Sequence, residues 1–256
     1  MDEIYDFALK DIDLHNKVIL DAAIGAGHAT RIWAEKIHEE GGTSKIIGVD
    51  AFEIPGEDQE EWKKAIVERL GKFKKYVEIR KANIFNLDFL EDEVIDIINC
   101  DDTLVFLNPK PLRVLQALSE FRRVLKKNGI LVITTELPLK DRREGQWLRW
   151  NFARGIYEMN GERWSTEIEA EELKYALQLL NFEIVAERIF EARRSEKYEA
   201  PMKEWLQIMM NYIHNLPYSE NLKKSLKGEA ERIYKKIENE GYLMMPPYYV
   251  VKCRKK

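Results

Sequence analysis

Apolar and polar positions follow two alternating patterns in the first half of the chain. Short apolar runs predict five buried strands, at 17–21, 45–50, 77–80, 94–99 and 130–135. Between them, apolar residues recur every three or four positions, which predicts helices over 29–40, over 59–73 and after Pro109. Strands that alternate strictly with helices are typical of a parallel, doubly wound α/β sheet. Ligands of such sheets bind at the carboxyl ends of the strands.

The pattern changes after Glu136. Residues 138–166 are rich in Arg and Trp and show no clear period. Beyond them we expect a helix over 167–180, strands over 182–187 and 247–253, and helical pieces broken near Pro217 between those two strands. The expected organisation has three parts: an N-terminal lid segment with Tyr5 and Phe7 as lid residues (1–14), a ligand-binding domain (15–190 plus 247–256), and a helical cap insertion (191–246).

The turn after the first strand is the strongest local signal. An apolar run ends at Asp21 and is followed by Gly25 and Gly27, which let the backbone turn sharply and let a ligand approach it. The second strand closes with Asp50, whose carboxylate can accept hydrogen bonds from both hydroxyls of a ribose. A nicotinamide-nucleotide enzyme would use Asp50 in the same way, but its fingerprint has a third glycine where this chain has Thr30.

The order of these motifs resembles the class I S-adenosylmethionine-dependent methyltransferases over about residues 15–190 plus the last strand. The segment 21–27 is similar to that family's Asp/Glu-x-Gly-x-Gly-x-Gly turn, with Ala23 in place of the first glycine. The segment 121–133 looks like its Arg-Val-Leu-Lys-Pro-Gly-Gly turn, with Lys-Asn-Gly replacing Pro-Gly-Gly. Segments 95–102 and 173–185 resemble its fourth strand and its Leu-x-x-Ala-Gly-Phe stretch.

The resemblance implies a mostly parallel, seven-stranded Rossmann-like sheet with helical cap insertions at its carboxyl edge. It also implies a methyltransferase enzyme that uses S-adenosyl-L-methionine and releases S-adenosyl-L-homocysteine. Asn83 stands where the family often has an Asp, and its amide oxygen can accept the same hydrogen bond from the adenine amino group. The cofactor-binding positions expected on this basis are Asp21, Ala23, Gly25, Gly27, Asp50, Ala51, Asn83, Ile84 and Cys100. The alternative interpretation of Asp21 is that it is an ordinary turn residue at the end of a strand.

No catalytic group follows from the sequence. The sulfonium is an activated methyl donor, so the enzyme must mainly align the reactants and exclude water. His28 and Asp101 are the candidates, against the alternatives that His28 simply opens a helix and that Asp101 and Asp102 form a solvated turn. We interpret Cys100 as a small buried residue rather than a nucleophile. No His, Cys and carboxylate spacing predicts a metal site.

The composition of the chain narrows the classes of acceptor to be considered. The net charge is −4 with both signs interspersed, which does not favour nucleic acid as a partner. Five of the seven Met lie between Met202 and Met245, and Trp147, Trp150 and Trp164 lie in the Arg-rich stretch. These side chains either line an apolar pocket or form the cap's own core, and we favour the core. We expect a small apolar acceptor; the alternatives are an RNA or protein methyltransferase, or a cofactor-binding protein without transferase activity.

The expected cellular location rests on two features that the sequence does not show. No apolar run reaches the roughly 18 residues that span a membrane. The acidic start of the chain lacks the order of a signal peptide, so we expect a cytoplasmic protein. The sequence does not determine the oligomeric state.

Overall fold

The computed structural model describes residues 2–51, 59–107, 111–162 and 165–256. The chain divides into two units. The first unit consists of Met1–Glu136, Glu167–Ile189 and Tyr248–Lys256, and the second of Leu137–Thr166 and Phe190–Pro247. The second unit therefore takes in residues 137–166, which the sequence analysis placed with the ligand-binding domain.

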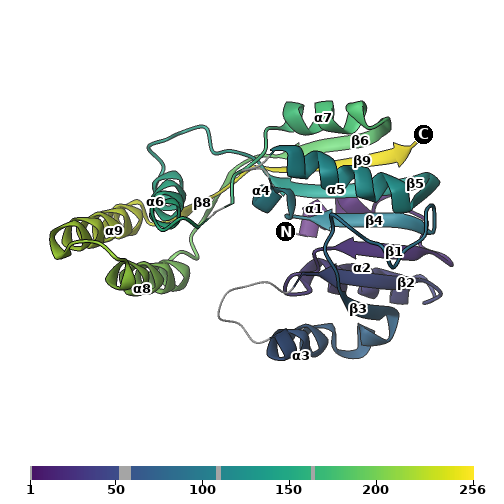
Figure 1. Ribbon diagram of the computed structural model, residues 1–256, viewed down its shortest axis with the longest axis horizontal. Coiled ribbons are helices and arrows are strands. Elements are labelled where there is room, and N and C mark those ends of the chain that lie inside the picture. The colour runs from purple at the N-terminus through teal and green to yellow at the C-terminus, as the bar shows by residue number, and fades with distance from the viewer. Residues whose placement is uncertain (1, 52–58, 108–110, 163–164) are drawn as a thin grey trace. The chain divides into compact units, whose positions relative to one another are not determined.

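The first unit contains a seven-stranded sheet in the order β3-β2-β1-β4-β5-β9-β6 (Figure 1). Its strands are β1 (Val18–Ala22), β2 (Lys45–Asp50), β3 (Val77–Lys81), β4 (Ile95–Asp101), β5 (Leu125–Glu136), β6 (Phe182–Phe190) and β9 (Tyr248–Lys255). The pairs β1–β2, β1–β4, β2–β3 and β4–β5 are parallel, whereas β9 runs antiparallel to β5. The mostly parallel, Rossmann-like α/β sheet predicted from the sequence is confirmed.

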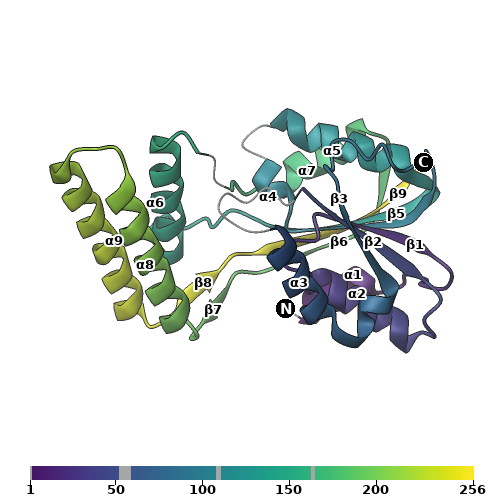
Figure 2. The same ribbon diagram turned by 60° about the horizontal axis from the view of Figure 1, so that its bottom comes forward.

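Helices cover both faces of this sheet, with α1 (Asp2–Leu9) and α2 (His28–Glu39) on one side and α5 (Pro111–Val124) and α7 (Ala170–Leu179) on the other (Figure 2). Because both faces are covered, Leu20, Ile98 and Leu131 in the central strands are fully buried. The unit also contains α3 (Gln59–Leu70), the 3₁₀ helix η1 (Gly71–Tyr76) and the short α4 (Leu104–Leu107). The helix predicted over 59–73 changes to 3₁₀ geometry after Leu70, where Gly71 has a φ of 51°.

Helix α1 is part of the first unit, within the stretch expected to form a lid. Ile4, Tyr5 and Ala8 are buried, and α1 packs against β9 and β5. The buried Lys252 of β9 donates to the carbonyl oxygens of Phe7 and Lys10, at 3.0 and 2.6 Å. The C-terminal carbonyls of a helix have no partner within the helix, so this ammonium group anchors the end of α1.

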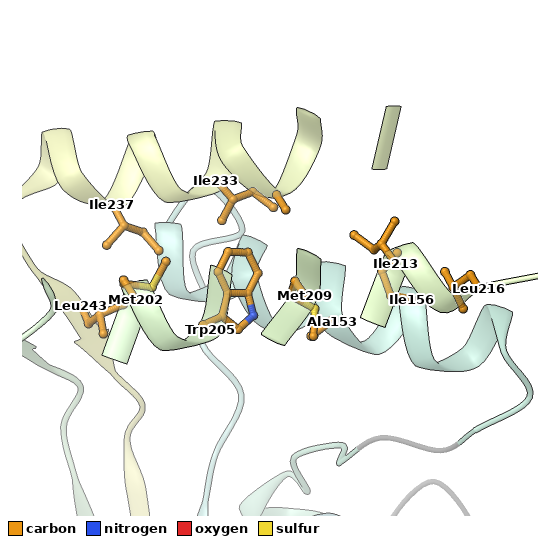
Figure 3. Close-up of a cluster of buried hydrophobic side chains, with 11 residues drawn as sticks. Ala153, Ile156, Met202, Trp205, Met209, Ile213, Leu216, Ile233, Ile237 and Leu243 are labelled. Carbon is orange, nitrogen blue, oxygen red and sulfur yellow. The ribbon is translucent and has the colours of Figure 1, made fainter. Parts of the chain in front are cut away.

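The second unit is built from α6 (Gly145–Met159), α8 (Glu199–Asn215) and α9 (Glu220–Glu240), together with an antiparallel pair of short strands, β7 (Arg193–Ser195) and β8 (Leu243–Met245). As expected, the break between two helices lies near Pro217. Figure 3 shows apolar side chains of the three helices gathered in one core. Met202 and Met209 are 1% and 2% exposed within it, so they belong to the unit's own core. Trp164 lies outside the described residues.

Candidate active site

A cleft of about 640 Å³ opens at the carboxyl ends of β1 to β4 in the first unit. This volume is within the usual range for small-molecule sites. Seven of the nine expected cofactor positions line it, namely Asp21, Ala23, Gly25, Asp50, Ala51, Asn83 and Ile84, and so do His28 and Asp101. Gly27 and Cys100 are not among its lining residues.

The turn after β1 adopts left-handed backbone conformations at three positions. Ala23, Gly25 and Gly27 have φ values of 63°, 51° and 77°. An alanine in this region costs roughly 1–2 kcal/mol, so Ala23 holds a conformation that glycine takes more easily. The Gly25 amide donates to the Asp50 carboxylate at 2.9 Å, which joins the turn to the end of β2.

The two glycines of this turn have different surroundings. Gly25 lies on the cleft wall, and a Cβ placed there would meet only the Ala23 carbonyl oxygen, at 3.9 Å. Gly27 is buried, and a Cβ there would lie 3.0 Å from Cγ2 of Ile66 on α3. Gly27 therefore lets α3 pack closely against the turn, whereas Gly25 keeps the cleft open.

Asp21 lies beneath the turn with an exposed fraction of 3%. Its carboxylate accepts hydrogen bonds from the Thr30 hydroxyl and, at 2.8 Å, from the Asn99 amide nitrogen. Burial raises the pKa of Asp21, and these two hydrogen bonds act against that rise. Thr30 belongs to α2 and Asn99 to β4, so Asp21 joins three elements at the base of the cleft. Thr30 stands at the position where a dinucleotide fingerprint would have glycine.

Side chains of α3 hold the turn from its other side. The Trp62 indole donates to the Gly25 carbonyl at 2.9 Å, and Arg69 donates to the Ala26 carbonyl at 3.0 Å. Trp62 also lines the cleft, a role that its helical spacing did not indicate.

At the end of β3 the exposed Asn83 closes a short turn, because its side-chain oxygen accepts from the Phe85 amide at 3.0 Å. An amide oxygen has two lone pairs, so Asn83 can accept a second hydrogen bond. Phe85 and Phe106 also line the cleft, and Phe106 is 68% exposed. These aromatic residues are not predicted from the sequence, in which the one signal is the apolar stretch that follows Asp102.

Asp101 and Asp102 mark the end of β4. The Tyr5 hydroxyl of α1 donates to Oδ2 of Asp101 at 2.9 Å, and the Tyr5 ring meets the His28 ring edge-on with centroids 5.8 Å apart. Asp102 accepts a hydrogen bond from the Glu136 amide at 3.3 Å. Burial raises the pKa of Asp101 to about 7; the Tyr5 hydrogen bond opposes the rise, and the negative charges of Asp102 and Asp21 add to it. The carboxyl group of Asp101 therefore changes charge near neutral pH.

Cys100 and His28 lie in opposite environments. Cys100 is completely buried, and burial raises the pKa of its thiol well above the usual range, which disfavours the reactive thiolate. His28 is exposed at the first position of α2.

The part of the chain that the structure describes contains neither a membrane-crossing helix nor a cluster of metal-binding side chains. None of the described helices is long and apolar enough to cross a membrane. In the same part of the chain, no group of three or more His, Cys, Asp or Glu side chains is placed to hold a metal ion.

Comparisons with known proteins identify one family. Residues 13–179 match the family model described as "Methyltransferase domain". A search of curated proteins found no significant match.

Solved structures share the fold at low sequence identity. A cyclopropane-fatty-acyl-phospholipid synthase-like protein from Lactobacillus casei ATCC 334 is 11% identical with a TM-score of 0.65, over 94% of this chain and 85% of the other. The [4+2]-cyclase SpnF is 17% identical, with a TM-score of 0.56 over 99% and 81% of the two chains. A geranyl diphosphate methyltransferase in complex with S-adenosylmethionine is 13% identical, with a TM-score of 0.53 over 100% and 84%.

Proposed function

The chain belongs to the class I S-adenosylmethionine-dependent methyltransferases, and from this premise we propose that the cleft binds S-adenosylmethionine along the ends of four strands. The strands stand in the order β3-β2-β1-β4. Asn83 and Ile84 follow β3 and would hold the adenine, Asp50 ends β2 and would hold the ribose, and the turn after β1 would hold the methionine part. The order of these groups along the sheet edge matches their order in the cofactor, and this match carries the proposal.

The residues present fit the cofactor chemically. A carboxylate offers about four lone-pair sites, so Asp50 can accept both ribose hydroxyls besides the Gly25 amide. Gly25 has no side chain, and space remains beside it for a ligand to approach the backbone. Asp21, Asp101 and Asp102 line the same cleft and supply negative charge beside a cationic ligand.

We infer that the acceptor is a small, apolar molecule that receives the methyl group by in-line transfer. The exposed Phe106 and the neighbouring Leu107 give the cleft an apolar wall next to the polar end of β4. The geranyl diphosphate methyltransferase of the comparison carries a small substrate in its own name, which supports the same class of acceptor.

The bound cofactor supplies an electrophilic methyl group, so the protein's work is to position groups and to move one proton at most. The Asp21 network fixes the turn that would hold the donor. Asp101 is placed by Tyr5 at the cleft wall and can take a proton when the acceptor atom carries one. His28, at the rim of the same cleft, is the other candidate for this step.

Calorimetric titration with S-adenosylmethionine and S-adenosylhomocysteine tests the cofactor proposal. We expect micromolar binding that Asp50→Ala weakens at least about tenfold, equivalent to about 1.4 kcal/mol. Asp88→Ala, at an exposed position outside the cleft, is the matched control and should bind like the wild type. Failure of well-folded wild type to bind either ligand would refute the proposal, and a nicotinamide nucleotide would be titrated next.

A second experiment separates the acceptor classes. Formation of S-adenosylhomocysteine is measured with a panel of small apolar molecules and, separately, with RNA and protein. Turnover on RNA, with retention of RNA that weakens steeply as salt rises, would favour the nucleic-acid alternative. Saturable cofactor binding without turnover on any acceptor would favour the alternative of a cofactor-binding protein without transferase activity.

A further inference from the structure

Asp101 lines the cleft together with the turn that would hold the methionine part. Strands β1 and β4 are parallel neighbours, and Asp21 is paired with Asn99. Beyond this pair the chain turns at Ala23, whereas β4 continues to Asp101, and both residues line the cleft. Neighbouring strands are about 5 Å apart, so the Asp101 carboxyl group borders the space over the turn.

The cofactor's sulfur atom joins its ribose to its methionine part. If Asp50 holds the ribose and the turn after β1 holds the methionine part, the sulfur lies over that turn, beside the end of β4. S-adenosylmethionine has a positive charge on this atom, and S-adenosylhomocysteine has none. The two ligands otherwise differ by one methyl group, so a comparison of their affinities reports the effect of one positive charge on binding.

We propose that Asp101, held in place by Tyr5, distinguishes the positively charged cofactor from its uncharged product, so that the cleft favours exchange of product for fresh cofactor. This inference rests on the proposed function. It concerns which ligand the cleft prefers and does not depend on the identity of the acceptor.

The groups around Asp101 leave it suited to a cationic ligand. Tyr5 faces it from α1, and Asp21 and Asp102 act on it from β1 and from the end of β4. Tyr248 of β9 is close enough for the negative charge of Asp101 to raise the pKa of its hydroxyl, after the larger effects of burial and of the Glu136 and Asp102 charges. His28 lies at the start of α2 with its ring against that of Tyr5, so the experiment includes a His28 variant. Arg113 of α5 lines the same cleft, with its guanidinium group over the Phe85 ring.

The direction of the pH effect follows from linkage. An opposite charge within about 4–6 Å lowers the pKa of a carboxyl group by roughly 1–3 units. At pH 6 a carboxyl group with a pKa of about 7 is mostly protonated, so binding of the cation must release that proton. At pH 8 the group is already ionised. The Kd of S-adenosylmethionine should therefore fall about 5- to 10-fold from pH 6 to pH 8, whereas that of S-adenosylhomocysteine should change less than about twofold.

The test is calorimetric titration of both ligands at pH 6 and pH 8 with wild type, Asp101→Asn and His28→Gln. We expect Asp101→Asn to remove the pH dependence specific to S-adenosylmethionine and His28→Gln to keep it. Parallel changes for both ligands in wild type, or loss of the effect in His28→Gln alone, would overturn the inference. Absence of binding by either ligand at both pH values would overturn the proposed function as well, so the two failures are distinguishable.

A direct measurement serves if Asp101→Asn does not fold. Aspartate carboxyl carbons labelled with ¹³C are titrated by NMR in wild type and Tyr5→Phe, each saturated with one ligand. The pKa of Asp101 should be lower with S-adenosylmethionine than with S-adenosylhomocysteine. Because the Tyr5 hydroxyl lowers this pKa, Tyr5→Phe should move both titrations to higher pH. Equal pKa values in the two wild-type complexes would contradict the proposal.

Discussion

Gly25→Ala should mainly weaken cofactor binding, whereas Gly27→Ala should mainly lower stability, although the two glycines share one turn. Both residues have a positive φ, so each substitution carries a strain of roughly 1–2 kcal/mol, partly offset by the smaller entropy of the unfolded chain. We expect Gly25→Ala to lower the free energy of unfolding by only about 1 kcal/mol. Its methyl group would project from the cleft wall, and S-adenosylmethionine affinity should fall at least about tenfold, since the ligand must approach that backbone.

Gly27→Ala adds a steric cost to the same strain. The new methyl group would lie 3.0 Å from Cγ2 of Ile66, whose side chain is fully buried and has little room to move. Overpacking of this kind costs about 1–3 kcal/mol, which brings the expected loss of unfolding free energy to about 2–4 kcal/mol. Cofactor affinity should stay within about threefold of wild type, because Gly27 does not line the cleft.

Urea unfolding gives the two stabilities and calorimetry gives the two affinities. A double-mutant cycle with Ile66→Ala isolates the steric part, since Gly27→Ala should cost only about 1 kcal/mol once the isoleucine is gone. Strict additivity of the two substitutions would show that Ile66 does not press on Gly27. If Gly27→Ala weakened cofactor binding as much as Gly25→Ala does, at unchanged stability, the distinction between the two glycines would be wrong.

Three further predictions concern other parts of the molecule. Met209→Ala should lower the unfolding free energy of the second unit by about 2–5 kcal/mol in urea, with cofactor affinity unchanged by calorimetry, because Met209 is buried in that unit's core. Lys252→Met should leave two carbonyl oxygens at the end of α1 without their donor and lower the free energy of unfolding by about 1–3 kcal/mol. Amide hydrogen exchange in α1 should become faster, and unchanged exchange would contradict this prediction. Cys100 and Cys253 should resist a thiol-specific reagent at pH 8 until the protein unfolds, because burial raises the thiol pKa of both, to about 12 for Cys253.

The strands of the sheet could be predicted because their signals are local. The strand predicted over 45–50 corresponds to β2, since one apolar run closed by an acidic residue is enough to identify it. Helix α6 was not predicted. Its buried positions include Gly145, Gln146 and Ala153, which do not make a clear apolar stripe.

The cleft was harder to predict than the sheet. The turn after β1 was found from its glycines, but Gly27 faces Ile66 and not the cleft, and only packing between distant segments decides this. The hydrogen bond between Tyr5 and Asp101 joins residues 96 positions apart, so no local pattern could reveal it. Contacts between side chains that meet only after folding are therefore the part of the site that local sequence patterns do not predict.

The position of β9 in the sheet has a consequence for how the protein is made. β9 follows every other strand of the sheet in chain order, yet it lies between β5 and β6, with neighbours on both sides. During translation β6 therefore leaves the ribosome before the strand that connects it to β5 exists. That edge of β6 remains unpaired while α8 and α9 of the second unit are synthesised, and exposed edges of this kind favour mispairing. We expect nascent chains stalled before Tyr248 to depend on chaperones, and chains released after β9 to become independent of them.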